Sequence, residues 1–103
     1  MTEGRVTVLA RVKARAGHEE EVRRLLLALV APSRAETGCL NYDLHQSADD
    51  PTEFMFYENW TSRAALDAHL EMPHLDEFDT LAEELLAAPV EITFWQMTSE
   101  LAG

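Results

Sequence analysis

The chain opens with alternating apolar and polar positions and then changes to helical spacing. Every second residue of 5–13 is apolar, which predicts a β-strand with one buried face. After Gly17, three glutamates suit the positive end of a helix dipole. A helical apolar stripe follows, formed by Val22, Leu25, Leu26, Leu29 and Val30. Pro32 is expected to kink or end this helix, and Gly38 to stop whatever continues.

The middle of the chain predicts a hairpin followed by an interrupted helix. Residues 39–46 and 52–60 have strand character, and residues 47–51 form a polar turn with proline, so the strands should pair antiparallel. Thr61 or Ser62 can cap the next helix, and Pro73 divides it into two segments. The inner face of the two segments carries Leu66, His69, Leu70, Leu75, Phe78, Ala82, Leu85 and Leu86. Pro89 closes the second segment, and residues 90–98 predict a last strand.

The resulting order, β-α-β-β-α-β with a split second helix, predicts one ferredoxin-like α+β domain over residues 1–103. Helices would cover only one face of its antiparallel sheet. Residues 54–60 and 90–97 nevertheless carry large apolar side chains on both parities. Because both faces need cover, we expect a homodimer built around a two-fold axis.

Charge and cysteine content narrow the possible partners and compartment. The net charge of -11 argues against nucleic acid and against an anionic membrane surface as partners. No apolar run approaches the length of a membrane-spanning helix. A single cysteine excludes an internal disulfide and no signal peptide is visible, so a cytoplasmic location is expected.

Candidate chemistry is concentrated at the end of the third predicted strand and on the following helices. His69 should point towards the sheet and could act as a general base, although a structural core histidine satisfies the same pattern. Trp60 is either core or a hydrogen-bond donor to a ligand. His74, directly after Pro73, is expected to have a structural role first. Glu58 shares a face with Trp60 and is either a solvated rim residue or a partner for an imidazole.

Other chemistries fail on spacing. His69 and His74 are five residues apart with a proline between them, unlike the i, i+4 pair of a zinc-binding helix, so no metal site is predicted. Cys39 has no CxxC partner, and the four glycines form no phosphate-binding loop. No cofactor is therefore expected.

Four stretches of the chain resemble one family. Residues 15–17, 36–42, 57–60 and 68–74 are similar to the antibiotic biosynthesis monooxygenase family, which includes quinol monooxygenases. The most specific part is Glu-x-Trp, ending at Trp60, followed by His-Leu-x-x-Pro-His, residues 69–74. The resemblance covers about residues 5–98 and implies a dimeric α/β barrel with a pocket in each subunit. It also implies oxidation of a small phenolic or hydroquinone-type substrate by O₂, without metal or flavin.

The resemblance assigns the site residues and leaves alternatives open. With this chemistry His69 would be the base, and Trp60 and Asn59 would stabilise the oxyanion. The further candidates for substrate contact are Tyr42, Tyr57, Glu58, His74 and Phe78. Isomerases of the same fold would need a cationic phosphate site, for which Arg34 and Arg63 are the candidates. Haem-degrading relatives have a histidine further along the second helical segment, a region in which this chain offers Phe78, so haem ligation is not expected. A non-catalytic ligand-binding dimer, with the pocket filled by phenylalanines, is the remaining alternative.

Overall fold

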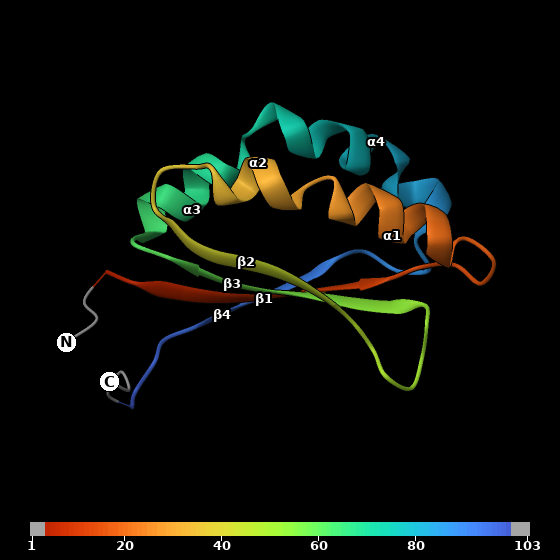
Figure 1. Cartoon of the computed structure of the whole chain (residues 1–103), viewed down its shortest axis with the longest axis horizontal. Helices are drawn as coiled ribbons and strands as arrows, with labels where there is room; N and C mark the ends of the chain where they lie inside the picture. Colours follow the sequence, from red (N-terminus) through yellow and green to blue (C-terminus); the bar gives the residue numbers. More distant parts are fainter. Residues whose placement is uncertain (1–3, 100–103) are drawn as a thin grey trace.

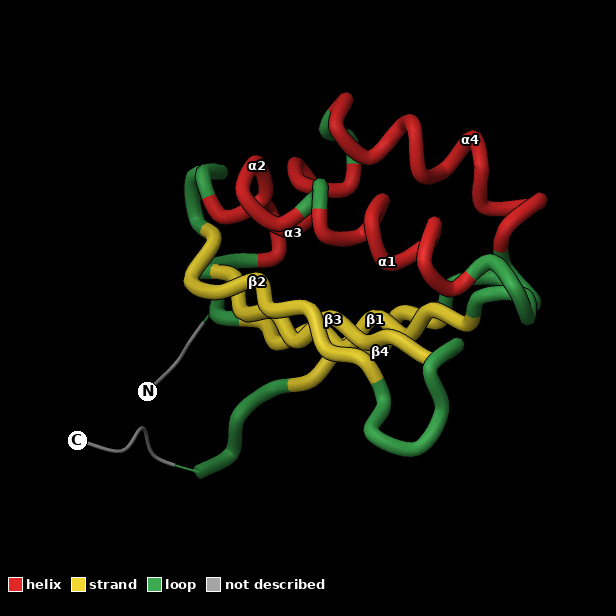
Figure 2. The backbone as a smooth tube through the Cα atoms, turned by 45° about the vertical axis from the view of Figure 1, so that its right-hand side comes forward, coloured by secondary structure: helices red, strands yellow, loops and turns green. Residues whose placement is uncertain are grey.

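The computed structural model describes residues 4–99 and has the predicted α+β architecture. In chain order its elements are β1 (Val6–Lys13), α1 (Glu19–Leu27), α2 (Val30–Arg34), β2 (Cys39–Gln46), β3 (Glu53–Trp60), α3 (Arg63–Leu70), the 3₁₀ turn η1 (Pro73–Leu75), α4 (Asp76–Leu85) and β4 (Glu91–Trp95). All helices lie on one side of the sheet (Figures 1 and 2). The β-α-β-β-α-β order with a split second helix is confirmed.

The four strands form one antiparallel sheet in the order β2-β3-β1-β4. Directly opposed residues face the same side of such a sheet, so the register fixes which side chains meet the helices. Val8 of β1 is opposite Glu58 of β3, and Val6 is opposite Trp60. Glu58 and Trp60 therefore lie on the helix-covered face, together with the buried Phe56.

The first helical stretch is broken as Pro32 predicts, but the break lies earlier than the proline. α1 ends at Leu27 and α2 begins at Val30, so Pro32 lies within the first turn of α2. There its missing N–H costs no helical hydrogen bond. A proline ring clashes with the carbonyl four residues before it, here that of Ala28, which explains the interruption between the two helices.

The second helical stretch is also divided, and this division directs His74. Ser62 caps α3, because its hydroxyl accepts a hydrogen bond from the Ala65 amide at 3.1 Å. Pro73 begins η1, which leads directly into α4. This turn brings His74 back towards α2, where its Nε2 lies 3.1 Å from the Ser33 hydroxyl.

The last strand is shorter than predicted. β4 ends at Trp95 instead of continuing to residue 98. Within residues 4–99 its partner strand is β1, and Trp95 already lies opposite Thr7. Beyond this pair β1 has only Val6, so the pairing ends close to the beginning of β1.

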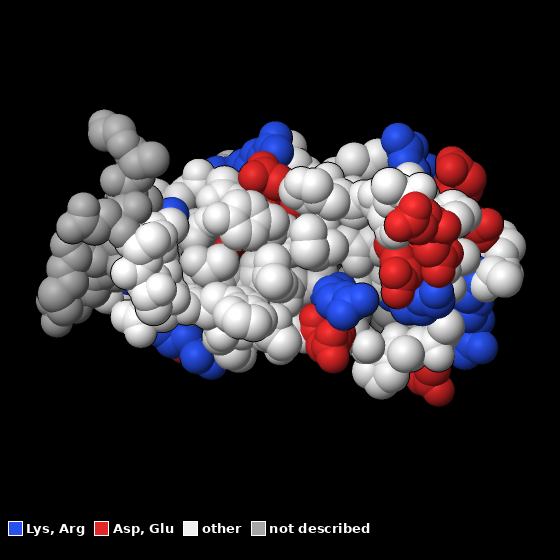
Figure 3. All heavy atoms as spheres, turned by 90° about the horizontal axis from the view of Figure 1, so that it is seen from below, with Lys and Arg blue, Asp and Glu red and all other residues white. Residues whose placement is uncertain are grey.

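The face of the sheet away from the helices carries a broad patch of uncharged side chains (Figure 3). Arg11 forms ion pairs with Glu53 and Glu91 on this face. Tyr57 and Trp95 are exposed on this face, at 37% and 55% of their surface. Charged side chains gather at one end of the view in Figure 3. Within residues 4–99, no helix is long and apolar enough to cross a membrane.

Candidate active site

A cavity of about 150 Å³ lies between the helix-covered face of the sheet and the helices. Its walls are largely apolar and come from all four strands, from α1, α3 and α4, and from the η1 turn. Four residues bring polar groups to it: Tyr42, Glu58, His69 and Asp79. Leu70 and Ile92, also among the lining residues, are 44% and 41% exposed, so the cavity opens between α3 and the β4 edge.

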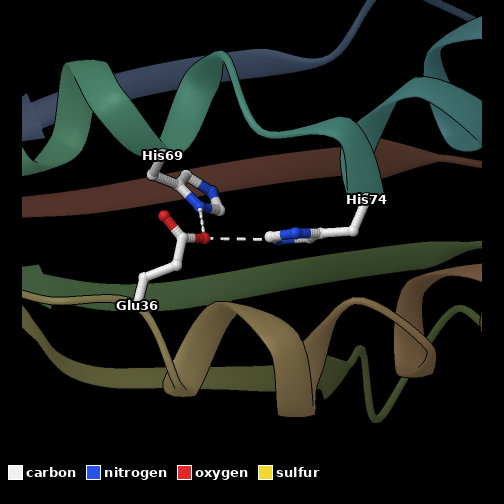
Figure 4. A group of neighbouring side chains, drawn as sticks. All are labelled: Glu36, His69 and His74. Carbon is white, nitrogen blue, oxygen red and sulfur yellow. Dashed lines mark hydrogen bonds and ion pairs between the residues drawn. The ribbon is translucent and has the colours of Figure 1, made fainter.

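The polar centre next to this cavity is Glu36, whose largely buried side chain lies between two histidines (Figure 4). Glu36 Oε2 lies 2.7 Å from Nδ1 of His69 and 3.2 Å from Nε2 of His74. A carboxylate oxygen accepts only, so the short contact places a proton on Nδ1 of His69. His69, which lines the cavity, is left with Nε2 as its second ring nitrogen, and no described residue hydrogen-bonds that atom.

Aromatic rings hold the His69 imidazole in place. Its ring centroid is 4.6 Å from the Trp60 ring and 5.3 Å from the Tyr42 ring. Trp60 and His69 are 0% and 3% exposed, respectively. Close packing and the Glu36 contact together restrict the imidazole to one orientation.

Glu58 is a buried carboxyl group in the cavity wall. Its Oε1 accepts a hydrogen bond from the Trp60 indole N–H at 2.9 Å. Burial raises the pKa of Glu58 from 4.5 to about 7; the Trp60 hydrogen bond opposes this rise, and the nearby Glu36 carboxylate adds to it. Near neutral pH this group can therefore exist as a proton donor.

Two further titratable groups in this region, the Tyr42 phenol and the Cys39 thiol, stay protonated at neutral pH. Burial, followed by the charge on Glu58, raises the pKa of the Tyr42 phenol well above its ordinary value of 10. Burial and the same two carboxylates, Glu36 and Glu58, raise the pKa of the Cys39 thiol to about 11. Tyr42 is thus a hydrogen-bond donor at neutral pH, and Cys39 is not a thiolate nucleophile.

The structure brings only part of the predicted set to the cavity. Tyr42, Glu58, His69 and Phe78 line it. Trp60 packs behind His69, and His74 is connected to His69 only through Glu36. Neither Trp60 nor His74 forms part of the cavity wall.

Asn59 and Tyr57 lie on the opposite face of the sheet. Asn59 pairs with Thr7 and Asn41, accepting from the Thr7 hydroxyl at 2.5 Å and donating to the Asn41 amide oxygen at 2.9 Å. Tyr57 is opposite Leu9 and shares this outward face. Alternation along β3 separates both residues from Glu58 and Trp60.

Glu36 is a candidate site residue that the sequence pattern did not indicate. It lies between α2 and β2, where helical or strand periodicity gives no direction. The local signal is Gly38, whose carbonyl accepts from the Thr61 amide at 2.8 Å and so fixes this loop beside the start of α3. Gly38 has a φ of +89°, and a Cβ there would lie 2.6 Å from the Ala65 side chain.

The two arginines considered for a phosphate site are engaged elsewhere. Arg34 donates to the Tyr42 carbonyl and to Asp43. Arg63 pairs with Asp67 and lies over the Phe94 ring, 4.4 Å from its centroid. Neither lines the cavity.

Comparison with known proteins agrees with this architecture. The chain is 42% identical over 88 residues to Rv0793 of Mycobacterium tuberculosis, covering 85% of this chain and 86% of that protein. It is 34% identical over 92 residues to an uncharacterized protein of Synechocystis, covering 89% of this chain but spanning only 63% of the relative. The crystal structure of PA3566 from Pseudomonas aeruginosa superposes with a TM-score of 0.89 at 40% identity, covering 96% of this chain and 99% of the other. The pattern described as antibiotic biosynthesis monooxygenase matches residues 5–81, and the chain belongs to that family.

Proposed function

We propose that this protein is a cofactor-independent monooxygenase that oxidises a small phenol or hydroquinone with O₂, using His69 as general base. The observation that carries the proposal is the cavity-lining imidazole, whose Nδ1 is held by the buried Glu36 carboxylate at 2.7 Å. Family membership supports oxygenase chemistry, and two of the relatives have monooxygenase in their names.

The first step is deprotonation of the substrate. A phenol has a pKa of about 10 and must lose its proton to become electron-rich. Nε2 of His69 accepts that proton, and the Glu36 carboxylate stabilises the imidazolium that forms, as the acidic member does in a catalytic triad. Glu36 is thus a positioning residue, while His69 contacts the substrate.

Oxidation then needs no external reductant. A hydroquinone can supply the electrons itself: one oxygen atom of O₂ enters the ring, the other leaves as water, and the product is a hydroxyquinone. The apolar walls keep bulk water away from the oxygenated intermediate, which prevents its stray protonation.

Cavity size and polarity define the substrate class. A cavity of 150 Å³ matches the size at which an engineered apolar cavity in another protein binds benzene, so it accommodates one six-membered ring. A second substrate hydroxyl would lie beside Glu58, whose carboxyl group is partly protonated near pH 7 and can accept or donate a hydrogen bond. We therefore favour single-ring substrates that have two oxygen substituents.

We further propose that the protein works as a homodimer through the sheet face away from the helices. This face exposes Tyr57 and Trp95, and it carries a broad patch of uncharged side chains (Figure 3). In a two-fold symmetric dimer, the outward sheet face of each subunit would cover that of the other subunit. Light scattering at micromolar concentration should give about twice the mass of one 11.6 kDa chain, and a mass near one chain would refute the dimer.

Oxygen consumption with a panel of single-ring hydroquinones tests the reaction. His69→Gln should lower kcat/KM by about 10²–10⁴-fold, the usual contribution of a general base. His45→Gln is the matched control, because His45 is exposed, does not line the cavity, and its ring hydrogen-bonds the Asp43 carbonyl. Equal rates in wild type and His69→Gln would show that His69 is not the base.

Glu36→Gln separates the positioning role from a structural one. It should lower kcat by about 10–100-fold. The loss should fall on kcat with KM little changed, because Glu36 acts through the imidazole and does not line the cavity. A rise in KM as large as the fall in kcat would contradict the proposed role of Glu36.

A further inference from the structure

Glu36, His69 and His74 converge from three separate segments on one point (Figure 4). Glu36 lies between α2 and β2, His69 on α3, and His74 in η1. One ligand atom from each side chain lies within 4.8 Å of the other two. We propose that these three residues bind a divalent transition-metal cation, with Zn²⁺ as the representative ion.

The two contacts of Glu36 are somewhat shorter than the distances between ligand atoms in a coordination shell. Zn²⁺ binds imidazole nitrogen and carboxylate oxygen at about 2.0–2.2 Å, so neighbouring ligand atoms of a tetrahedral shell are about 3.3–3.6 Å apart. Glu36 Oε2 lies 2.7 Å from Nδ1 of His69 and 3.2 Å from Nε2 of His74. Adjustments of the side chains, without a change of fold, would admit the ion between them.

The donor set selects the class of cation. Two imidazoles and one carboxylate form the ligand set of several zinc and non-haem iron sites, whereas Ca²⁺ and Mg²⁺ prefer oxygen ligands. The Ser33 hydroxyl, 3.1 Å from Nε2 of His74, or a water molecule would complete the shell. The spacing of His69 and His74 did not predict this site, because it was compared only with the i, i+4 histidine pair of a zinc-binding helix.

Charge and access favour a cation here. The Glu36 side chain is only 7% exposed, and its ion pairs among residues 4–99 are with the two histidines and not with lysine or arginine. The chain has a net charge of -11, which raises the local concentration of cations. The His74 side chain is 22% exposed and provides the route by which an ion would enter.

Metal binding would change the chemistry of the cavity, a consequence that rests on the proposed function. Without metal, Nδ1 of His69 carries the proton and Nε2 has the free lone pair. When the metal takes the Nδ1 lone pair, the proton moves to Nε2, so the cavity receives a hydrogen-bond donor in place of a base. Zn²⁺ should therefore inhibit proton abstraction by His69.

Calorimetric titration of the metal-free protein with ZnCl₂, together with visible absorption after Co²⁺ addition, tests the site without any substrate. One ion per chain is expected. His74→Gln and Glu36→Gln should each weaken binding by at least about tenfold. His18→Gln and His45→Gln replace exposed histidines and should leave binding unchanged. Urea unfolding of each variant establishes that it is folded.

The outcomes separate the site from the reaction. Absence of stoichiometric binding to wild type would overturn the proposal, as would binding that survives both His74→Gln and Glu36→Gln. If no hydroquinone is oxidised, the proposed function fails while the titration still decides the metal site. If Zn²⁺ binds at this site and oxygen consumption is unchanged, the tautomer switch is wrong.

Discussion

Replacing Glu58 by glutamine should stabilise the protein in alkaline solution and leave its stability nearly unchanged in acid. The glutamine amide oxygen can still accept the hydrogen bond from Trp60, so the substitution mainly removes a titratable proton. Glu58 is 4% exposed, and burial raises its pKa from 4.5 to about 7. The unfolded chain therefore loses this proton at a lower pH than the folded protein does.

The size of the effect follows from this pKa difference. Between pH 4.5 and about 7 the folded state binds more protons than the unfolded state, so the free energy of unfolding falls as pH rises. At 1.36 kcal/mol per pKa unit, the wild type should lose about 3 kcal/mol of stability from Glu58 by pH 8. Glu58→Gln lacks this loss.

Urea unfolding of both proteins at pH 5, 6, 7 and 8 measures the difference directly. Comparison at each pH cancels the contribution of all other titrating groups. The stability advantage of Glu58→Gln should grow towards about 3 kcal/mol at pH 8. A difference that stays constant across this range would refute the assignment of a raised pKa to Glu58.

The other expected outcomes concern the framework that holds the site. In urea unfolding, Gly38→Ala should destabilise the protein far more than Gly17→Ala. Both glycines have φ near +90°, but only at Gly38 would a Cβ collide with a neighbour. Equal losses of stability would show that the close contact is unimportant. Ser62→Ala should cost about 1 kcal/mol through loss of the α3 cap, with Ser62→Asp retaining most of the stability; equal losses in the two variants would exclude capping. Trp60→Phe should make stability fall more steeply with pH, because it removes the hydrogen bond that opposes the raised pKa of Glu58; an unchanged slope would contradict this.

Periodicity was sufficient to predict most of the fold. Alternation in residues 5–13 and the spacing of Val22, Leu25 and Leu26 correctly indicated a strand and a helix, since burial of one face determines both patterns. Pro73 correctly marked the division of the second helix. The extent of β4 was not predictable in the same way, because it depends on where the partner strand begins.

The candidate site was only partly predictable. Alternation along β3 placed Glu58 and Trp60 together, and the same argument applied to Asn59 would have put it on the other face. The inward direction of His69 followed from helical spacing, and the structure agrees. Glu36 could not be selected, because a side chain between two elements has a direction only after the loop is folded against α3.

The hairpin turn at residues 47–51 lies at the end of β2 and β3 remote from Glu36 and Trp60, which flank the opposite ends of these strands (Figure 1). Ala48 and Asp49 are exposed, and the turn is closed by its own contacts, including Asp50 with Thr52. The molecule therefore has a permissive end for protein engineering. A fluorescent label, an affinity tag or new chain termini placed between Ala48 and Asp49 would report on the enzyme without entering the region where the reaction is proposed to occur.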